Sequence, residues 1–600
     1  MLGITATVIL MQTQGYSAAT LQPSSNGRYI QWSDGTPVFL LSDTCWLLPG
    51  RYSTSEITAH VNTRKSQGFT ALQMSACFPE VQGGTALQNI NAIFTGGDLA
   101  RPVASYWNMV DAKVKQCTDA GMIVILNPFW KKTYDSWLDA NGPTKCRAYG
   151  KWFATRYRNN PRVAYFVGGD DRPEPIRDEM NNMGLGIQDA YAAAGLPKPI
   201  VAYHGDPGQT SREAFPTETW VTLNWSYNYA PPFSGAEGTG GSPYVDNWQD
   251  WVKTPAKPIQ FGEGFYDRNN GGAASSRWGD RFMLRRQAWW STVGGGIGGY
   301  AYGAEPIWLH GYGGFSVAQA AGWESGKDAA RMKSFLTGNM QWWKLQPDIN
   351  HKFLTGGYGT FKRLDYALAA VANDNSFAVV YSPTAHTLNL RMPASGLTYT
   401  LRWFDPSSGA FRSGSTTAAS GAAVNMTTPG NNASGKPDWV IFATTSGGGG
   451  GGGGGVTPGN GTFKITSLIS GKALDAFSGH TTNGTPIIQW TYGGGNNQRW
   501  TLQDRGASQF SIIGVASGKA LDVTGNGIAN GTKVQLWTYT GVANQKWTFS
   551  ATSGGFYRVT PVHATGSCLD VTGASTANGA PIQIWTYKGD SNQQWSFTAP

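Results

Sequence analysis

The segment Val163-Ala164-Tyr165-Phe166-Val167-Gly168-Gly169-Asp170 decides the fold class of this chain. Its first five residues form an unbroken apolar run, which is typical of a strand buried on both faces, as in a parallel sheet. Two glycines end the run, and an acidic residue follows them directly. Because the active site of an α/β barrel lies at the carboxyl ends of its strands, this segment predicts a barrel strand that carries a functional carboxylate.

Seven further apolar runs of this kind occur in the first part of the chain. They occupy residues 38–41, 70–74, 122–126, 200–203, 221–224, 259–261 and 297–302. Helical patterns lie between most of them; Val110, Val114 and Cys117, for example, recur at a helical spacing. Eight strands separated in this way predict a (β/α)8 TIM barrel. An open doubly wound sheet is the alternative, but no GxGxxG motif follows an early strand, which argues against a dinucleotide site.

The chain changes character after the barrel. Residues 366–442 hold short strands separated by Asn, Pro, Ser and Gly, which predicts a small β-sandwich. Residues 447–455 are all glycine, and polyglycine buries no surface, so this stretch predicts a flexible tether. The predicted domains are a barrel at 20–357, a β-sandwich at 358–445, a polyglycine linker at 446–460 and a further domain at 461–600.

The segment after the glycines repeats itself three times. An Asn-Gln-x-Trp motif recurs at residues 497–500, 544–547 and 592–595, and a Leu-Asp pair at 474–475, 521–522 and 569–570. Self-similarity at a fixed period indicates structural units that stack on a shared core. Three copies predict a closed domain with three-fold symmetry.

The first 19 residues have the pattern of a secretory signal peptide. Residues 2–11 are apolar, and the small residues Ser17, Ala18 and Ala19 suit a cleavage site. A first strand of the folded protein is the alternative. The stretch is too short to cross a membrane, and no other long apolar run occurs. The sequence therefore predicts a secreted, extracellular protein with no membrane partner.

Composition narrows the range of partners. The net charge is +9, but no Lys/Arg run exceeds two residues, so the basic clusters typical of nucleic-acid binding are missing. The five Cys residues show no CxxC or Cys/His spacing, which predicts neither a metal nor another cofactor. The 25 Trp, 25 Tyr and 26 Phe residues are compatible with large cores or with stacking on sugar rings. We expect a monomer whose partner is a polysaccharide or an oligosaccharide.

Two acidic residues directly follow predicted barrel strands and small Gly residues: Asp170 after the fourth strand and Glu263 after the seventh. Glycoside hydrolysis needs such a pair, because one carboxylic acid protonates the leaving oxygen while a carboxylate attacks the sugar or activates water. We therefore expect Asp170 and Glu263 to be catalytic. Two alternatives remain open, namely that Asp170 caps the next helix and that Glu263 forms a buried ion pair.

Further side chains near the predicted strand ends suit sugar binding, because aromatic rings stack on sugars and polar groups hold hydroxyls. The residues expected to line one cleft are Asp43, Trp46, Asn127, Trp130, His204, Tyr302 and Trp308. We expect Ala substitutions at these positions to lower activity without unfolding the protein.

Residues 25 to about 350 resemble the apiosidase-like catalytic domains related to glycoside hydrolase family 140. The matching motifs lie at residues 39–46, 68–70, 165–170, 262–263 and 299–303. The resemblance implies a retaining glycosidase in which Asp170 is the acid/base and Glu263 the nucleophile. One departure is that the large retaining barrel clan commonly carries Asn-Glu after strand four, where this chain has Gly169-Asp170.

The two later segments also resemble known domains. Residues 360–443 resemble a small β-domain that often follows this barrel and has been labelled collagen-binding, although we expect it to brace the barrel instead. Residues 461–600 resemble ricin-type β-trefoil lectins of carbohydrate-binding module family 13. That resemblance implies sugar pockets in the second and third repeats, formed by Asp522, Gln535, Trp537 and Asn544 and by Asp570, Gln583, Trp585 and Asn592. In the first repeat Ile488 replaces the Gln, so a working pocket at Asp475 is not expected.

These patterns predict a secreted retaining glycoside hydrolase that acts on a plant or microbial polysaccharide and is anchored to it by the β-trefoil. A non-catalytic carbohydrate-binding protein with a degenerate barrel is the alternative. A peptidase is disfavoured, because neither an HExxH nor a GxSxG motif occurs.

Overall fold

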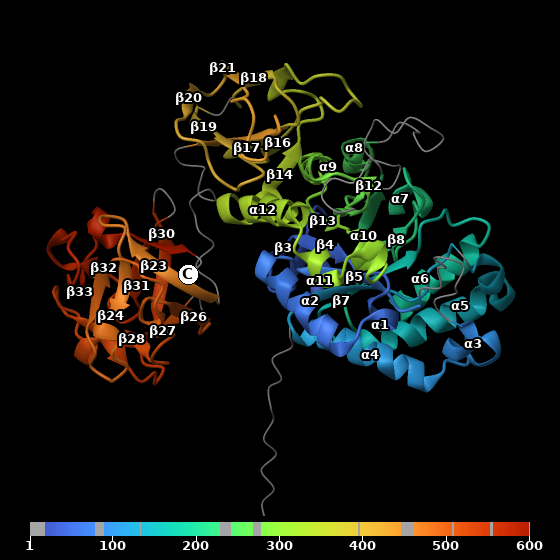
Figure 1. Ribbon diagram of the computed structural model, residues 1–600, viewed down its shortest axis with the longest axis horizontal. Coiled ribbons are helices and arrows are strands. Elements are labelled where there is room, and N and C mark those ends of the chain that lie inside the picture. Colours follow the sequence, from blue (N-terminus) through green and yellow to red (C-terminus); the bar gives the residue numbers. More distant parts are fainter. Residues whose placement is uncertain are drawn as a thin grey trace, which may run out of the picture.

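The computed structural model describes residues 19–77, 89–132, 134–228, 242–267, 278–393, 396–445, 461–506, 509–552 and 556–598. The predicted polyglycine linker, and the predicted signal peptide apart from Ala19, lie outside these ranges. Within them the chain forms a parallel barrel, a β-sandwich and a β-trefoil (Figure 1).

Eight parallel strands form a nearly closed barrel in the order β8-β7-β6-β5-β4-β13-β10-β9. Their bounds are Leu40–Thr44 (β4), Ala71–Ser75 (β5), Ile123–Asn127 (β6), Val163–Gly168 (β7), Val201–His204 (β8), Asn224–Tyr227 (β9), Ile259–Glu263 (β10) and Gly299–Tyr302 (β13). All eight predicted runs are confirmed as strands. The sixth begins later than predicted, at Asn224, because Thr222 and Leu223 both donate their N–H groups to the carbonyl of Val201 and leave the regular ladder.

A serine side chain bridges the gap between β8 and β9, which form no ladder with each other. The hydroxyl of Ser211 accepts hydrogen bonds from the N–H groups of Tyr203 (3.0 Å) and Trp225 (2.9 Å). It donates to the carbonyl of Tyr203 at 2.7 Å. One hydroxyl thereby satisfies buried backbone groups that a ladder would otherwise pair.

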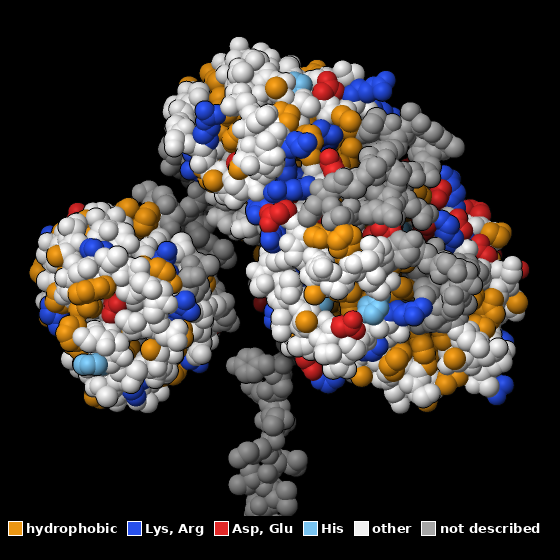
Figure 2. Space-filling model, viewed as in Figure 1, with side chains coloured by type: hydrophobic (Ala, Val, Ile, Leu, Met, Phe, Trp, Pro, Cys, Tyr) orange, Lys and Arg blue, Asp and Glu red, His pale blue; other side chains and the backbone are white. Residues whose placement is uncertain are grey.

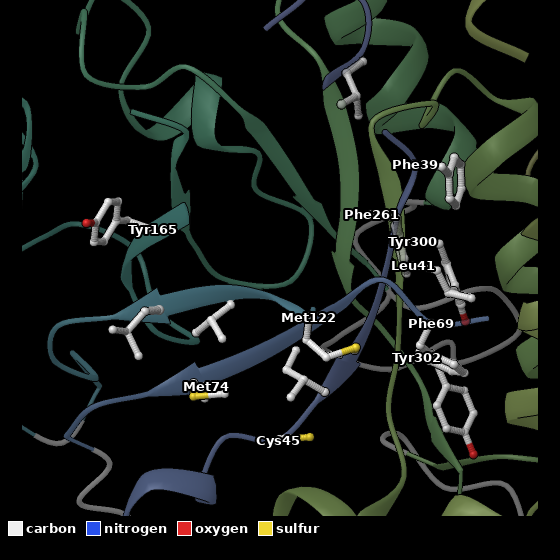
Figure 3. Packing of buried hydrophobic residues seen from close by; sticks show 14 of the residues in the cluster. Phe39, Leu41, Cys45, Phe69, Met74, Met122, Tyr165, Phe261, Tyr300 and Tyr302 are labelled. Atoms are coloured by element: carbon white, nitrogen blue, oxygen red, sulfur yellow. The ribbon is translucent and has the colours of Figure 1, made fainter. Parts of the chain in front are cut away.

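A helix follows each barrel strand along the chain. These helices are α2 (Thr54–Gln67), α4 (Ala104–Asp119), α5 (Asp135–Tyr157), α6 (Arg177–Ala192), α7 (Ser211–Ala214), α8 (Pro243–Trp251), α9 (Arg281–Val293) and α12 (Glu324–Asn339). Shorter helices are α1 (Leu48–Arg51), α3 (Ile90–Ile93), α10 (Glu305–Trp308) and α11 (Val317–Ala321). Side chains alternate between the two faces of a strand, so Leu41, Tyr165 and Phe261 belong to the layer outside the barrel wall (Figure 3).

Two small sheets accompany the barrel. The first consists of β1 (Leu21–Pro23), β2 (Ile30–Trp32) and β3 (Pro37–Val38). The second pairs β11 (Tyr266–Asp267) with β12 (Trp278–Gly279), just after β10, which places Tyr266 near the carboxyl end of that barrel strand.

The β-sandwich consists of a six-stranded and a three-stranded sheet with an apolar core between them. Its strands are β14 (Leu345–Pro347), β15 (Leu354–Gly356), β16 (Leu368–Ala372), β17 (Phe377–Ser382), β18 (Thr387–Arg391), β19 (Thr398–Phe404), β20 (Thr416–Ala419), β21 (Ala423–Thr427) and β22 (Trp439–Thr445). The other face of the larger sheet packs on the barrel helices: Trp289 of α9 stacks on Tyr381, with ring centroids 5.8 Å apart. The two domains therefore share a continuous apolar cluster.

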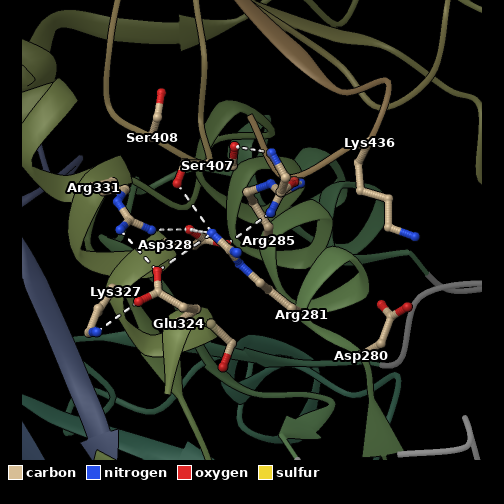
Figure 4. A network of polar contacts seen from close by, with 12 residues as sticks. Asp280, Arg281, Arg285, Glu324, Lys327, Asp328, Arg331, Ser407, Ser408 and Lys436 are labelled. Carbon is tan, nitrogen blue, oxygen red and sulfur yellow. Dashed lines mark hydrogen bonds and ion pairs between the residues drawn. The ribbon is translucent and has the colours of Figure 1, made fainter. Parts of the chain in front are cut away.

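A buried polar network also joins the barrel to the sandwich. Arg285 of α9 contacts both carboxylate oxygens of Asp438, at 2.6 and 2.7 Å, and reaches Asp328 of α12 at 2.9 Å. Asp328 in turn accepts from Arg281, whose guanidinium also donates to the carbonyl of Ser407 (Figure 4). Burial by itself lowers the pKa of Arg285, but the two carboxylates outweigh it and raise that pKa above its usual value. Buried charges are tolerated only when they are paired in this way.

The C-terminal region is a β-trefoil of three four-stranded repeats. Its strands are β23 (Gly461–Ser467), β24 (Ala473–Ala476), β25 (Ile487–Trp490), β26 (Trp500–Asp504), β27 (Phe510–Gly514), β28 (Ala520–Val523), β29 (Val534–Trp537), β30 (Trp547–Ala551), β31 (Tyr557–Pro561), β32 (Ser567–Val571), β33 (Ile582–Thr586) and β34 (Trp595–Thr598). The Trp of each Asn-Gln-x-Trp motif is fully buried and donates its indole N–H to the carbonyl of the repeat's own Leu-Asp pair, at 2.9 Å for Trp500, 3.1 Å for Trp547 and 2.9 Å for Trp595. The same Trp-to-Leu hydrogen bond thus occurs once in each of the three repeats.

Three further observations concern the surface charge, the cysteines and the helices. Acidic and basic side chains are interspersed over the face shown in Figure 2. The five cysteines are buried free thiols. No helix in the described ranges combines the length and the apolar character that crossing a membrane requires.

Candidate functional site

The turn after β7 brings Asp170 to the mouth of the barrel, and it requires glycine at two positions. A Cβ on Gly168 would lie 2.6 Å from the carbonyl oxygen of His204, and one on Gly169 would lie 2.6 Å from the ring of Trp130. Asp170 itself adopts a left-handed backbone conformation with φ of 52°. Non-glycine residues adopt this conformation at a cost, and such strain is concentrated at functional sites.

The carboxylate of Asp170 is held by two side chains from neighbouring elements. Tyr227, at the end of β9, donates its hydroxyl to Oδ1 at 3.0 Å, and the ammonium of Lys132 lies 2.7 Å from Oδ2. The Asp170 side chain is 15% exposed, so it remains reachable from solvent. The next helix along the chain, α6, begins at Arg177 and has Ile176 as its N-cap residue. Asp170 therefore does not cap that helix.

Glu263 closes β10 on the same side of the barrel. Tyr266 donates its hydroxyl to Oε1 at 2.7 Å, and Nε2 of His204 lies 2.7 Å from Oε2. Tyr227 is the register partner of Glu263 on β9, and its hydroxyl reaches Asp170. Tyr227 therefore lies beside Glu263 in the sheet and contacts the carboxylate of Asp170 with its side chain.

His204 lies in a box of aromatic rings beneath Glu263. Its imidazole is stacked between the rings of Trp46 and Trp225, at centroid distances of 5.9 and 5.3 Å, and the edge of Trp130 lies 5.3 Å away. Packing against these three rings restricts the orientation of the imidazole, whose Nε2 lies close to Oε2 of Glu263. The predicted residues Trp46, Trp130 and His204 therefore meet at one place.

Trp308 and Asn127 lie at the same end of the barrel, but only Trp308 has a polar group without a partner among the described residues. The ring of Trp308, from α10, lies 5.6 Å from that of Tyr266, and its buried indole N–H has no acceptor within the described part of the chain. Asn127 instead uses its amide on the backbone, donating to the carbonyl of Gly168 at 2.9 Å and accepting from the N–H of Phe129 at 2.8 Å. Its position fits a role in holding the turn that carries Asp170.

Asp43 and Tyr302 lie elsewhere than the sequence predicts. Both point to the outside of the barrel wall: Asp43 pairs with Arg64 of α2 at 2.7 Å, and Tyr302 donates to Asp267 at 3.0 Å. Burial alone would raise the pKa of Asp43, but Arg64 and His60 hold it below its usual value. The physical reason is strand alternation, because Ser42, one residue earlier, is the residue that faces the barrel axis.

Asp43, Cys45 and His60 form a cluster outside the barrel wall, and a metal ion bound there would be repelled by the charge of Arg64. Ligand atoms of Asp43, Cys45 and His60 lie within 4.8 Å of one another. The guanidinium of Arg64, however, already contacts both oxygens of Asp43. The arrangement is that of a buried ion pair.

Three residues of the mouth were missed by sequence reasoning, namely Tyr227, Tyr266 and Lys132. Tyr227 escaped notice because the sixth strand was placed three residues too early. Tyr266 lies three residues beyond Glu263, in a segment with no periodic pattern. Lys132 belongs to a two-residue basic run that is part of no recognised motif.

In the trefoil, each Leu-Asp aspartate is fixed by amide side chains. In the second repeat, Asn544 and Gln545 donate to Oδ2 of Asp522 at 3.0 and 3.1 Å, and Gln535 donates to Oδ1 at 3.0 Å. The third repeat repeats this pattern around Asp570, with Asn592, Gln593 and Gln583 at 2.9, 3.1 and 3.0 Å. The Trp537 ring beside the first of these pockets is 41% exposed, whereas Trp585 is half-buried.

No working pocket is expected at Asp475 in the first repeat, but the structure has a cavity beside this residue. A cavity of about 440 Å³ is lined by Asp475, Phe477, Trp490 and Asn497, among others. Trp490 and Phe477 are each 44% exposed. Asn497 and Gln498 hold Oδ2 of Asp475 at 3.0 and 2.7 Å, while Ile488 supplies no donor to Oδ1. Burial raises the pKa of Asp475, and these two amides oppose the rise.

Family models match three successive parts of the chain. Residues 24–342, more than half of the chain, match the apiosidase-like catalytic domain. The chain belongs to the apiosidase-like family. In this apiosidase-like chain, residues 359–444 match the family described as "Putative collagen-binding domain of a collagenase", and residues 461–595 match the ricin-type β-trefoil lectin domain. The comparison with curated proteins finds no match.

Two solved structures share the arrangement of barrel and sandwich. A glycoside hydrolase of family 5 from Bacteroides vulgatus is 21% identical, with a TM-score of 0.59, and the alignment covers 71% of this chain and 93% of that one. A second glycoside hydrolase is also 21% identical, with a TM-score of 0.59 and coverage of 72% and 97%. At this identity the likeness shows the fold. The apiosidase-like chain thus joins a glycoside hydrolase-like catalytic domain to a carbohydrate-binding lectin domain.

A buried carboxyl near the mouth should make stability depend on pH. Asn228, the residue after β9, donates to Asp246 of α8 at 2.6 Å, and burial raises the pKa of Asp246 to about 7. Because the folded state holds this proton more tightly than the unfolded state, stability falls as pH rises from about 4 to about 7. Asn at position 246 keeps an acceptor for Asn228 but carries no charge. The free energy of unfolding of Asp246→Asn, relative to that of the parent, should therefore increase over this pH range, by about 4 kcal/mol at most.

Urea unfolding of the parent and Asp246→Asn at pH 5 and pH 8 would measure this difference. Asp34→Asn, on an exposed turn, is the control and should leave the pH dependence unchanged. A difference between Asp246→Asn and the parent that is the same at both pH values would contradict the assignment.

Proposed function

We propose that the protein is a secreted, retaining glycoside hydrolase that cleaves a plant or microbial polysaccharide. The observation that supports the proposal is that Asp170 and Glu263 end barrel strands at the same mouth, where Tyr227, from the strand beside Glu263, donates its hydroxyl to Asp170. Secretion is supported by the apolar amino-terminal residues and by the combination of two carbohydrate-active domains.

The contacts of Glu263 suit a nucleophile. Tyr266 donates a hydrogen bond to Oε1, and the imidazole of His204 lies 2.7 Å from Oε2, so we propose that the carboxylate is oriented for attack on the anomeric carbon of a bound sugar. The attack forms a glycosyl–enzyme ester and releases the aglycone oxygen, and water then cleaves that ester. Retention of configuration requires carboxyl groups about 5–5.5 Å apart, so we propose that spacing for Asp170 and Glu263.

Asp170 is placed to act as the acid and then the base. As an acid it must carry a proton, which it gives to the leaving oxygen, and it later takes a proton from the attacking water. In the structure, however, the ammonium of Lys132 already contacts Oδ2 of Asp170 at 2.7 Å, where the leaving oxygen would have to approach. We therefore propose that the contact between Lys132 and Asp170 opens when substrate enters.

The aromatic side chains supply the sugar-binding surface in this proposal. Trp46 and Trp130 pack against His204 and Trp308 packs against Tyr266, which are the two residues next to Glu263. The free indole N–H of Trp308 is suited to a sugar hydroxyl. Asn127 acts indirectly, through the turn that it holds. Asp43 and Tyr302 stabilise the barrel wall, and Ala at either position should lower stability.

The direct test is reducing-sugar release from a panel of polysaccharides, with product anomers followed by proton NMR. We expect release from at least one polysaccharide, with the product first formed in the configuration of the substrate. Inverted product would overturn the retaining mechanism. Binding of a polysaccharide without release of new ends from any panel member would favour the non-catalytic alternative.

We propose that the trefoil holds the enzyme on its substrate through Asp522, Gln535, Trp537 and Asn544 in the second repeat and Asp570, Gln583, Trp585 and Asn592 in the third. The cavity beside Asp475 supports a third pocket, whose preference differs because Ile488 replaces a donor. Each pocket is small, so affinity for a polymer should come from simultaneous binding.

Removing two of these aspartates should weaken attachment but not chemistry. We expect Asp522→Ala/Asp570→Ala to bind an insoluble substrate about 10- to 100-fold more weakly in a depletion assay. Turnover of a small soluble substrate should stay the same. Asp504→Ala, on a trefoil strand outside the pockets, is the matched control. Unchanged attachment of the double variant would refute these assignments.

A further inference from the structure

A second hollow of about 440 Å³ lies on the β-sandwich. It is formed by β14 and the turn after it, by the hairpin between β16 and β17, and by the end of β18. Besides the carboxylate of Asp348, its lining contains a set of basic and amide side chains, called the polar lining below: Gln346, Asn350, Lys352, Asn373, Asn375 and Arg391. Cavities of this size are typical of small-ligand sites.

One wall is a turn fixed by its own acid. The carboxylate of Asp348 accepts hydrogen bonds from the backbone N–H groups of Lys352 (2.8 Å), Phe353 (3.0 Å) and Leu354 (2.8 Å). These bonds hold the backbone at Lys352 at the edge of the hollow. Because these three hydrogen bonds occupy the carboxylate of Asp348, it forms no ion pair with Lys352 or Arg391 in the described part of the chain.

The opposite wall is the tip of the hairpin between β16 and β17. Its acid, Asp374, is paired with Lys344 at 2.7 Å and is not part of the lining. Asn375 adopts a left-handed conformation with φ of 60°, and its carbonyl accepts from Tyr399 at 2.6 Å. The tip therefore has a fixed shape and presents two amides, from Asn373 and Asn375, to the hollow.

The side chains in the polar lining have no partners of their own. In the described part of the chain, no carboxylate pairs with Lys352 or Arg391, and the four amide side chains of the lining make no hydrogen bond. Apolar groups of Phe353, Val371 and Met392 complete the surface. The hollow thus combines two unpaired cations, four free amides and an apolar floor.

We propose that this hollow binds an acidic saccharide, with a sugar carboxylate on Arg391 and Lys352 and sugar hydroxyls on the amides. Charge-assisted hydrogen bonds to a carboxylate are the strongest contacts that such side chains make. Amides suit hydroxyls, and the apolar floor suits the C–H face of a sugar ring. The charge of the ligand follows from the hollow, whereas its saccharide class rests on the proposed function.

Calorimetry with the full chain and hexagalacturonate tests the proposal. Lys352→Ala/Arg391→Ala should weaken binding about five- to tenfold, because partly exposed ion pairs are individually modest. Lys362→Ala/Arg363→Ala removes the same two residue types outside the hollow and should leave binding unchanged. Methyl-esterified hexagalacturonate and inorganic sulfate separate the carboxylate from the sugar, and both should bind more weakly than the free acid.

Hydrogen-exchange mass spectrometry then locates the ligand. We expect hexagalacturonate to protect the segments at 346–353, 371–376 and 391–393 in the parent and not in the Lys352→Ala/Arg391→Ala variant. Protection confined to the trefoil, equal weakening in both double variants, or no binding at millimolar ligand would overturn the proposal. Hydrolysis is measured separately, so loss of this site with retained activity leaves the proposed function intact.

Discussion

Replacing Glu263 with Gln should reduce turnover of any substrate found by about 10³- to 10⁵-fold, which corresponds to ~4–7 kcal/mol of transition-state stabilisation. Gln has nearly the same shape and still accepts the hydrogen bond that Tyr266 donates, so the fold should be retained. What it lacks is the charge that attacks the anomeric carbon. The measurement is kcat for parent and variant, with the unfolding midpoint as the check on folding.

Azide distinguishes the two carboxylates in the proposed mechanism. With Glu263→Ala, azide can take the place of the nucleophile and should yield a glycosyl azide of inverted configuration. With Asp170→Ala, azide should attack the glycosyl–enzyme ester and yield a glycosyl azide of retained configuration, most readily when the leaving group needs no proton. The assignment of roles fails if both variants give the same configuration.

The largest effect on stability is expected at the joint between barrel and sandwich. Asp438→Ala should cost about 3–5 kcal/mol, because it leaves Arg285 buried with half of its ion-pair partners removed. Native domains are stable by only about 5–15 kcal/mol, so this loss should lower the first unfolding transition seen by calorimetry. Asp374→Ala, which breaks an exposed pair with Lys344, is the matched control and should cost less than about 1 kcal/mol.

A double-mutant cycle separates the pair from its surroundings. Arg285→Met/Asp438→Ala removes both charges, so it should be less destabilising than the sum of the two single variants. Additive effects would show that the cost comes from lost packing alone.

Sequence reasoning found the barrel because its signals are local. Apolar runs such as residues 163–167, ended by glycine, mark buried parallel strands wherever they lie in the chain. The trefoil was equally accessible, since an internal repeat shows itself in one sequence. These patterns single out Asp170 and Glu263 at strand ends and the repeated aspartates of the trefoil, and neither pattern depends on tertiary contacts. The roles of these residues remain predictions.

Errors arose where one residue decides which face of a strand a side chain occupies. Asp43 follows Ser42, and only the strand's exact register tells that the serine faces the axis and the aspartate faces α2. Tyr227, at the end of β9, and Lys132, beyond β6, both contact Asp170, and no spacing along the chain reveals these contacts. The buried contact between Arg285 and Asp438, 153 residues apart, is beyond sequence patterns for the same reason.

The three identical Trp-to-Leu bonds of the trefoil have an evolutionary consequence. Because each repeat anchors its own aspartate and its own indole, a pocket can change its rim without disturbing the core that the repeats share. The replacement at Ile488 is such a change, and Asp475 keeps its two amide partners in spite of it. If the proposed pockets bind sugar, divergence of this kind would let the three repeats of one chain differ in the glycan that each prefers.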